Sequence, residues 1–254
     1  MKTEPIYLTD PYRQNMSAKI LEILPEPAKR LRVLLDQTVF YPMGGGQPTD
    51  QGQLAWSSNS GDSVIPQAKI YQVMLKEGEI WHYLEPLRPD MPLLEVGQTV
   101  EGSLDWGRRY QNMRVHSAGH LVDFALFQLG FVPEVLKPLK GEHGKKPYVL
   151  YEGSLANRSE NLDQASLNAI IARLIEQERK FSWDFASLEK LEAEAIYLQP
   201  GLPANKPLRK LTLEGVGTVA DGGTIVGNSR EVGQVSIVSI EDWGDQVKIS
   251  YQLG

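Results

Sequence analysis

Short apolar runs separated by turn-forming residues make up the first hundred positions of the chain. The runs are rich in Val, Ile and Leu, and Pro, Gly, Asp and Ser stand between them. This pattern is typical of strands, which we place at residues 19–24, 30–36, 64–75, 79–84 and 99–104. Several short strands joined by glycine-rich turns favour a small β-barrel.

The spacing of apolar residues becomes helical after residue 106. Residues 107–129 contain no proline, and apolar side chains recur there at helical spacing. We predict a helix that ends at Gly130, since glycine commonly terminates helices. Further helices are predicted at residues 162–181 and 185–196.

Strand patterns return in the second half of the chain, at residues 148–152, 209–213, 234–240 and 247–252. Residues 133–147 are rich in Pro and Gly and are expected to form a loop. Together the elements predict an α+β fold with two domains. Residues 1–106 would form an N-terminal small β-barrel, and residues 107–254 an α+β domain in which a helix packs on an antiparallel sheet.

Composition places the chain among ordinary globular proteins, with 254 residues, 41% hydrophobic and 23% charged. There is no cysteine, which excludes disulfides and thiolate metal ligands and fits a reducing compartment. We see no signal peptide and no apolar stretch long enough to span a membrane, so a cytoplasmic protein is expected.

The net charge of −6 argues against nucleic-acid binding unless the basic residues cluster, because neutralising phosphates requires Lys and Arg. Three clusters do occur. They are Arg108, Arg109 and Arg114; Lys137, Lys140, His143, Lys145 and Lys146; and Lys206, Arg209 and Lys210. Charged runs are usually solvated faces, so these clusters alone leave RNA binding open.

His116 and His120 form the most informative local pattern, since residues four apart share one face of a helix. Two imidazoles at this spacing can bind one metal ion. They can equally be two polar helix residues with ordinary hydrogen bonds, because a metal needs further ligands that the pair does not supply.

Two glycine-rich segments accompany the histidines. Residues 40–52 include three successive glycines, which permit positive φ angles and a close approach of the backbone to a ligand, or a long β-turn. No GK[ST] follows, so this is not a phosphate loop. In residues 220–226, Asp221 precedes two glycines and is either a metal ligand or, more commonly, a residue that caps a turn.

The order of these segments resembles that of a known family. The chain reads F-Y-x-x-G-G-G-Q-P-x-D-x-G at residues 40–52, then R-R followed by H-x-x-x-H at 108–120, G-S at 153–154 and G-G-T-x-V at 222–226. In combination they resemble the stand-alone alanyl-tRNA editing proteins of the AlaX group, which are related to the editing domain of alanyl-tRNA synthetase. The resemblance covers essentially the whole chain.

The resemblance implies a hydrolase that removes serine, and in some members glycine, from wrongly charged tRNA(Ala) at a zinc ion. The family holds zinc with an H-x-x-x-H pair and a C-x-x-x-H pair. His116 and His120 match the first pair, but Asp221 replaces the cysteine and Ile225 the histidine of the second. Because Asp can bind zinc and Ile cannot, the expected ligands are His116, His120 and Asp221, with one position open for water or an ester carbonyl.

The family motifs also imply residues that act on the substrate. Gln47 is expected in the site wall, and the hydroxyls of Thr49 and Thr224 are candidates to contact a serine side chain, which alanine lacks. These three are the candidate catalytic residues. The candidate substrate-binding residues are Gly44, Gly45, Gly46, Arg108 and Arg109. Nucleotide and ATP binding are expected on the same grounds.

Two other functions stay open at this point. The loss of the family histidine at Ile225 fits a metal-free tRNA-binding relative that has no activity. An editing-like hydrolase that acts on another aminoacyl-tRNA or on a small ester would carry the same motifs. The residues do not indicate which amino acid is removed, how the acceptor stem is recognised or which oligomer forms.

Overall fold

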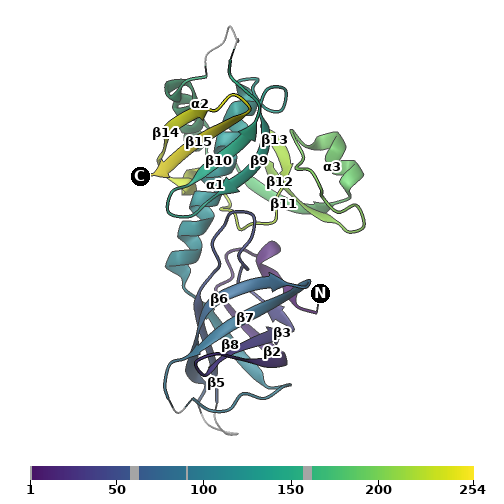
Figure 1. The fold of residues 1–254 in the computed structure, drawn as a ribbon, viewed down its shortest axis with the longest axis vertical. Coiled ribbons are helices and arrows are strands. Elements are labelled where there is room, and N and C mark those ends of the chain that lie inside the picture. The colour runs from purple at the N-terminus through teal and green to yellow at the C-terminus, as the bar shows by residue number, and fades with distance from the viewer. Residues whose placement is uncertain (1, 58–62, 90, 157–161) are drawn as a thin grey trace. The chain divides into compact units, whose positions relative to one another are not determined.

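The computed structural model describes residues 2–57, 63–89, 91–156 and 162–254. The chain divides into two compact units (Figure 1). The first consists of Met1–Gly44 and Pro48–Gln111, and the second of Gly45–Gln47 and Asn112–Gly254. The short segment Gly45–Gln47 therefore belongs to the second unit, although its neighbours in sequence belong to the first.

The first unit is built around a closed β-barrel. Within its described residues six strands close the barrel in the order β2-β3-β7-β6-β5-β8, and all neighbours are antiparallel. Their bounds are β2 Asn15–Glu26, β3 Arg30–Leu35, β5 Gly52–Trp56, β6 Ile65–Lys76, β7 Glu79–Pro86 and β8 Thr99–Leu104. Buried and exposed residues alternate along the start of β2, as expected for a strand with one face in the core.

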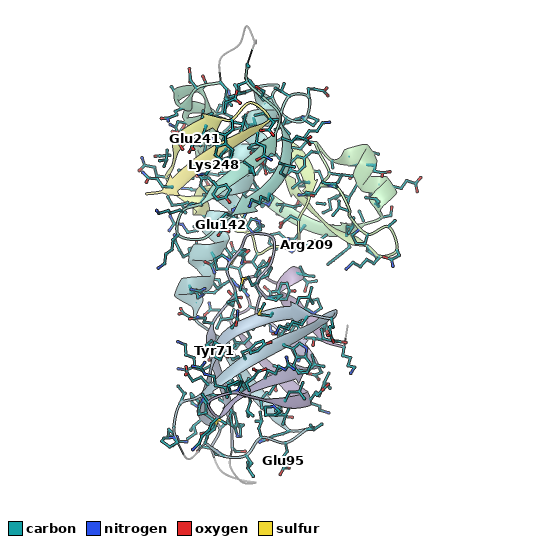
Figure 2. The ribbon with its side chains drawn as sticks, viewed as in Figure 1. Tyr71, Glu95, Glu142, Arg209, Glu241 and Lys248 are labelled. Atoms are coloured by element: carbon teal, nitrogen blue, oxygen red, sulfur yellow. The ribbon has the colours of Figure 1, made fainter. Side chains whose placement is uncertain are left out.

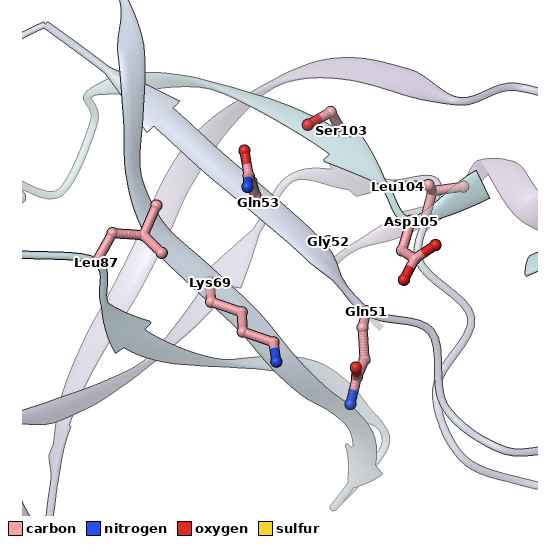
Figure 3. Close-up of a pocket in the computed structure, with 8 residues that line it drawn as sticks. All are labelled: Gln51, Gly52, Gln53, Lys69, Leu87, Ser103, Leu104 and Asp105. Carbon is pink, nitrogen blue, oxygen red and sulfur yellow. The ribbon is translucent and has the colours of Figure 1, made fainter. Parts of the chain in front are cut away.

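The first unit also holds β1 (Glu4–Pro5) and β4 (Gln37–Thr38), which pair in parallel, and the 3₁₀ helix η1 (Ile6–Leu8). Its interior contains aromatic side chains such as Phe40 and Trp56, both at most 1% exposed. A pocket of about 410 Å³ on this unit is lined by residues of β5, β6 and β8 and by flanking residues (Figure 3). None of the candidate site residues named above lines it.

The second unit combines helices with two antiparallel sheets. Among its described residues, one sheet has the order β14-β15-β10-β9 and the other β11-β12-β13 (Figure 1). The strands are β9 Lys137–Glu142, β10 Tyr148–Glu152, β11 Phe181–Ala186, β12 Leu208–Leu213, β13 Gly217–Ala220, β14 Val235–Asp242 and β15 Gln246–Leu253. The helices are α1 Trp106–Gln128, α2 Gln164–Glu176, α3 Leu188–Glu194 and the 3₁₀ helix η2 Ser229–Val232. The predicted α+β class is confirmed, and the division into domains at residue 106 stays a prediction.

Helix α1 ends as the sequence predicts. Gly130 has a φ of 76°, and the amide of Phe131 donates to the carbonyl of Leu126 at 2.9 Å. A left-handed glycine with this backward hydrogen bond is a common helix terminus, because it pairs a carbonyl that the helix leaves open. No described helix of the chain combines the length and the apolar character needed to cross a membrane.

The predicted helices at 162–181 and 185–196 are wrong at their ends. Helix α2 ends at Glu176, and residues 181–186 form strand β11, which pairs with β12. Helix α3 begins only at Leu188, where the side chain of Ser187 accepts a hydrogen bond from the amide of Lys190. The aromatic residues of β11 alternate with polar ones, and pairing with β12 stabilises the extended form of this segment.

Part of the predicted loop at 133–147 is also a strand. Residues 137–142 form β9 at one edge of the four-stranded sheet. Pro138 is tolerated there because an edge strand leaves one row of backbone groups unpaired, and a register shift opposite it adjusts the pairing with β10. The short strands β5 and β13 were not predicted either.

Candidate metal centre

Three side chains of the second unit come together as candidate metal ligands. His116 and His120 lie one turn apart on α1, and Asp221 follows the last residue of β13. One ligand atom from each lies within 4.8 Å of the others. His116 is 3% and His120 6% exposed, so the centre lies in a largely dry environment where an unpaired charge would be costly.

The distances from Asp221 to the two histidines fit a small tetrahedral ion. The Oδ1 atom of Asp221 lies 3.4 Å from Nε2 of His116 and 3.5 Å from Nε2 of His120. Four ligands placed tetrahedrally around zinc at its usual N and O distances are about 3.3–3.4 Å apart. Both ring nitrogens of His120 are buried without a hydrogen bond in the described part of the chain. Buried polar atoms are rarely left in this state, and a metal ion would satisfy Nε2.

Gln47 orients His116. Its Oε1 atom lies 2.8 Å from Nδ1 of His116 and accepts the amide N–H of Thr224 at 3.0 Å. Its Nε2 atom donates to the hydroxyl of Thr224 at 2.8 Å. The Thr224 amide identifies this atom as the amide oxygen, which has no hydrogen to donate. Nδ1 of His116 must therefore be the donor, and the lone pair of the neutral ring is on Nε2, which faces Asp221.

Asp221 serves as a turn residue and as a candidate ligand with different oxygens. Its Oδ2 accepts the amide N–H of Gly223 at 3.0 Å and lies 3.2 Å from Nη1 of Arg209. Its Oδ1 is the atom that faces the histidines. The two readings of this residue from the sequence are therefore compatible, because one oxygen holds the turn and the other remains for a metal.

Arg209 of β12 holds this turn through hydrogen bonds. Its Nη1 atom also donates to the carbonyl of Gly223 at 2.9 Å, and its guanidinium lies 5.1 Å from the centroid of the Trp183 ring. Arg209 is 5% exposed (its position is labelled in Figure 2). A buried guanidinium beside a carboxylate favours the ionised form of Asp221 that a metal requires.

The charges of the centre act on one another. Burial raises the pKa of Asp221, but the lowering effect of His116, His120 and Arg209 is larger. The pKa therefore lies well below its usual range. Burial lowers the pKa of His116 to about 4, against the attraction of Asp221. Burial also lowers the pKa of His120, but the contacts with Asp123 and Asp221 outweigh this and raise it to about 9. A neutral His116 beside an ionised carboxylate is the form that can bind a metal.

Two glycines leave space that the centre needs. A Cβ atom on Gly223 would lie 2.0 Å from Cε1 of His116. A Cβ atom on Gly46, where φ is 79°, would lie 2.1 Å from the carbonyl oxygen of Gly141. The third glycine of the first motif therefore permits a close approach of two backbone segments, since no side chain fits between them.

A third buried imidazole lies against the centre. The His143 ring stacks on His116 with centroids 4.3 Å apart, and its Nδ1 atom lies 2.7 Å from the hydroxyl of Tyr251, which donates to the carbonyl of Val115. Burial lowers the pKa of His143 well below its usual value. The sequence places His143 only in a basic cluster, and its surroundings depend on contacts distant in sequence.

The remaining residues expected at the site have other contacts. Thr49 accepts the amide N–H of Val73 at 2.8 Å, inside the first unit. Arg108 donates to the carbonyl of Thr49 at 2.9 Å. Arg109 is fully buried, forms an ion pair with Asp50 and donates to the carbonyl of Pro11 at 2.8 Å. These contacts are those of structural residues, and the predicted substrate roles of Thr49, Arg108 and Arg109 gain no support from them.

The three glycines before Gln47 make mainly backbone contacts. Gly44 precedes the segment Gly45–Gln47, and its carbonyl accepts the hydroxyl of Tyr41 at 2.9 Å. Gly45 has a φ of 54°, and the carbonyl of Gly46 accepts the amide N–H of His143 at 2.8 Å. Of the predicted residues, the structure thus brings together His116, His120, Asp221, Gln47 and Thr224. Ile225, next in sequence, is fully buried.

Comparisons with known proteins point to one group, although no family model matches the chain. The alanyl-tRNA editing protein AlaX-M of Methanosarcina barkeri is 28% identical, and the match covers 98% of both chains. AlaX-L of Pyrococcus horikoshii is 37% identical over 50% of this chain and 28% of its own length. The alanine–tRNA ligase of Thermococcus kodakarensis is 30% identical over 97% of this chain, which spans only 25% of the ligase.

Proposed function

We propose that this chain, which belongs to the AlaX-type alanyl-tRNA editing proteins, hydrolyses the ester bond of tRNA(Ala) wrongly charged with serine, and to a lesser extent with glycine. The substrate class is inferred from the editing proteins and ligases that the chain resembles. The residues of the second unit supply the chemistry.

The observation that carries the proposal is that Oδ1 of Asp221 lies 3.4 Å from Nε2 of His116 and 3.5 Å from Nε2 of His120, close to the ligand spacing of a tetrahedral zinc site. Two imidazoles and one carboxylate with an open fourth position are the arrangement of hydrolytic zinc centres. Zinc bound there would polarise the ester carbonyl or lower the pKa of a bound water. The family histidine has no counterpart at Ile225, which is buried and apolar, so the fourth position stays open.

The other residues act by position. Gln47 holds the ring of His116, and the hydroxyl of Thr224 accepts a hydrogen bond from the side-chain amide of Gln47. Arg209 holds the carboxylate of Asp221. Because Gln47 holds His116 and Arg209 holds Asp221, these two ligands are oriented before the ester arrives, which lowers the cost of organising the site for reaction. Thr224 is fully buried and thus supports Gln47 from inside the wall.

The second unit also offers a surface for the tRNA. Lys137 and Lys140 on β9, and Lys145 and Lys146 after it, are all exposed. They flank His143, whose ring is stacked on His116. Lysines in this place suit the phosphates of an acceptor stem that brings its ester to the centre, in spite of the acidic net charge. Action on tRNA implies a cytoplasmic location.

The test is deacylation of Ser-tRNA(Ala), Gly-tRNA(Ala) and Ala-tRNA(Ala) by the purified protein, with zinc and after chelation. We expect serine to be released fastest and alanine to be retained. His116→Ala and Asp221→Asn should abolish the release. Asp163→Asn is the matched control, since Asp163 caps α2 and Asn caps helices equally well.

The possible outcomes separate the functions. Loss of serine no faster than in buffer would overturn the proposal. Tight tRNA binding without deacylation would indicate the metal-free binding protein. Release of another amino acid from its own tRNA would indicate a different editing substrate. Deacylation that survives both chelation and His116→Ala would keep the editing function and exclude the metal.

A further inference from the structure

A second buried carboxylate lies one turn beyond His120 on α1. Asp123 is 4% exposed, and its Oδ2 atom lies 3.5 Å from Nδ1 of His120. Neither the family motifs nor the three-ligand set accounts for it. A buried acid in the middle of a helix is costly unless its oxygens are bonded, so its surroundings indicate what it does.

Two tyrosines hold the carboxylate of Asp123 in one orientation. The hydroxyl of Tyr151, on β10, donates to Oδ1 at 2.6 Å. The hydroxyl of Tyr197, after α3, donates to Oδ2 at 2.9 Å. Burial and the nearby charge of Asp123 raise the pKa of both phenols well above its usual value, so both remain donors. The tyrosines therefore fix the orientation of the carboxylate.

Asp123 faces the nitrogen of His120 that a metal would leave protonated. Each ring nitrogen faces a carboxylate at 3.5 Å, Nδ1 that of Asp123 and Nε2 that of Asp221. A metal ion bound by Asp221 and by Nε2 of His120 would leave the N–H on Nδ1, beside Asp123.

The two histidines of the centre thus have partners of different kinds. Nδ1 of His116 faces the neutral amide oxygen of Gln47 at 2.8 Å, whereas Nδ1 of His120 faces a carboxylate. Histidine ligands whose second nitrogen donates to a carboxylate become more basic and bind their metal more tightly. His120 would therefore be the stronger of the two imidazole ligands.

We propose that Asp123, held by Tyr151 and Tyr197, is a positioning residue that accepts the Nδ1–H of the metal-bound His120 ring and strengthens it as a zinc ligand. This inference rests on the metal centre of the proposed function. The simplest alternative is that Asp123 only ties β10 and the segment after α3 to α1. In that case its removal lowers stability and leaves zinc affinity unchanged.

The experiment measures zinc affinity by competition with a chromophoric chelator, together with thermal unfolding of the metal-free protein. We expect Asp123→Asn to weaken zinc binding about 10- to 100-fold, the usual effect of losing such a partner. Tyr151→Phe and Tyr197→Phe each remove one donor and should weaken it about two- to fivefold, a smaller part of the same loss. Asp50→Asn is the matched control, because Asp50 is also a buried acid paired within the barrel unit. It should lower stability with unchanged zinc affinity.

A second readout does not depend on the stability of one variant. The proton chemical shift of the His120 Nδ1–H, measured by NMR in the zinc-loaded protein, reports whether this group donates to a carboxylate. We expect a strongly downfield shift in the parent protein that moves upfield in Tyr197→Phe. If Asp123→Asn does not fold, the tyrosine variants still test the inference.

Two results would overturn it, and they differ in what they say of the function. If zinc affinity and the Nδ1–H shift are unchanged in the folded Asp123 or Tyr197 variants, Asp123 has no such role, and the editing proposal stays intact. A parent protein that binds no zinc would remove the metal centre together with this inference. Deacylation of Ser-tRNA(Ala), measured separately, would then decide whether the editing function survives.

Discussion

The amide oxygen of Gln47 lies 2.8 Å from Nδ1 of His116, so a residue 69 positions earlier in the chain fixes the first candidate ligand. The same oxygen accepts the amide of Thr224. The motif that contains Gln47 and the motif that contains Thr224 therefore meet at one histidine, and side chains of the three segments form one hydrogen-bonded cluster.

Replacing Gln47 tests this contact. Gln47→Ala leaves Nδ1 of His116 and the amide of Thr224 without a partner, and an unpaired buried group costs about 1–3 kcal/mol. We expect zinc affinity to fall about 10- to 100-fold, as for other lost partners of metal-binding histidines. Gln53→Ala, an exposed glutamine of β5, is the control and should change neither quantity. Equal zinc affinity in both variants would show that Gln47 does not position the ring.

The adjacent glycines 222 and 223 offer a sharper comparison. A Cβ atom on Gly223 would lie 2.0 Å from Cε1 and 2.3 Å from Nδ1 of His116, whereas a Cβ atom on Gly222 would have no described heavy atom within 4 Å. Gly223→Ala should therefore displace His116, lower the free energy of unfolding by about 1–3 kcal/mol and weaken zinc binding more than tenfold. Gly222→Ala should do neither. Calorimetric unfolding and competition with a chelator give the stability and the zinc affinity of both variants. Equal values in the two variants would contradict the close contact between Gly223 and His116.

His143 allows a prediction with a built-in rescue. A Cβ atom on Gly119 would lie 2.6 Å from Cε1 of His143, so Gly119→Ala should destabilise the protein by about 1–3 kcal/mol through overpacking. Gly107→Ala on the same helix meets only an ordinary contact at 3.6 Å and should be neutral or slightly stabilising. Chemical unfolding gives both values.

The rescue comes from a double substitution. Removing the ring in Gly119→Ala/His143→Ala should make the alanine at 119 cost less than it does in the parent protein. If the cost is the same with and without the ring, Gly119 is required for another reason. The hydroxyl of Tyr251, 2.9 Å from the same Cβ position, would be the next contact to test.

Local patterns in the sequence predict the part of the centre that depends on local geometry. The spacing of His116 and His120 places both rings on one face of α1, and the glycine after α1 ends the helix as expected. The dual use of Asp221 is beyond such patterns, since it depends on which oxygen faces Arg209. The same holds for His143, whose neighbours at 116 and 251 are brought to it by the folding of α1 and β15.

The errors in the predicted elements differ in their cause. Residues 181–186 are a strand because they pair with β12, and the alternation of their aromatic residues was the signal for it. Residues 137–142 contain Pro138 and Gly141, two residue types that generally disfavour strands. They are tolerated here because β9 lies at the edge of its sheet. Residues 181–186 thus carried a local signal, whereas the strand at 137–142 depends on its place at the sheet edge, which the local sequence does not encode.

His82 predicts how stability depends on pH in the barrel unit. Its ring is fully buried, with Nε2 2.7 Å from the hydroxyl of Thr38, and burial lowers its pKa from 6.5 to about 4 against a backbone hydrogen bond with Val33. The unfolded chain therefore takes up the proton first, so stability is complete above pH 6.5 and falls as the pH decreases towards 4. The pKa difference corresponds to about 3 kcal/mol at most.

The measurement compares free energies of unfolding in urea at pH 7 and pH 4 for the parent protein and for His82→Gln. We expect the variant to be less stable at pH 7, because a packed ring and its hydrogen bond are lost, but to lose about 3 kcal/mol less on acidification. The histidines of the second unit titrate in both proteins and cancel in the comparison. Equal losses would mean that His82 is already accessible to protons in the folded barrel, which its complete burial argues against.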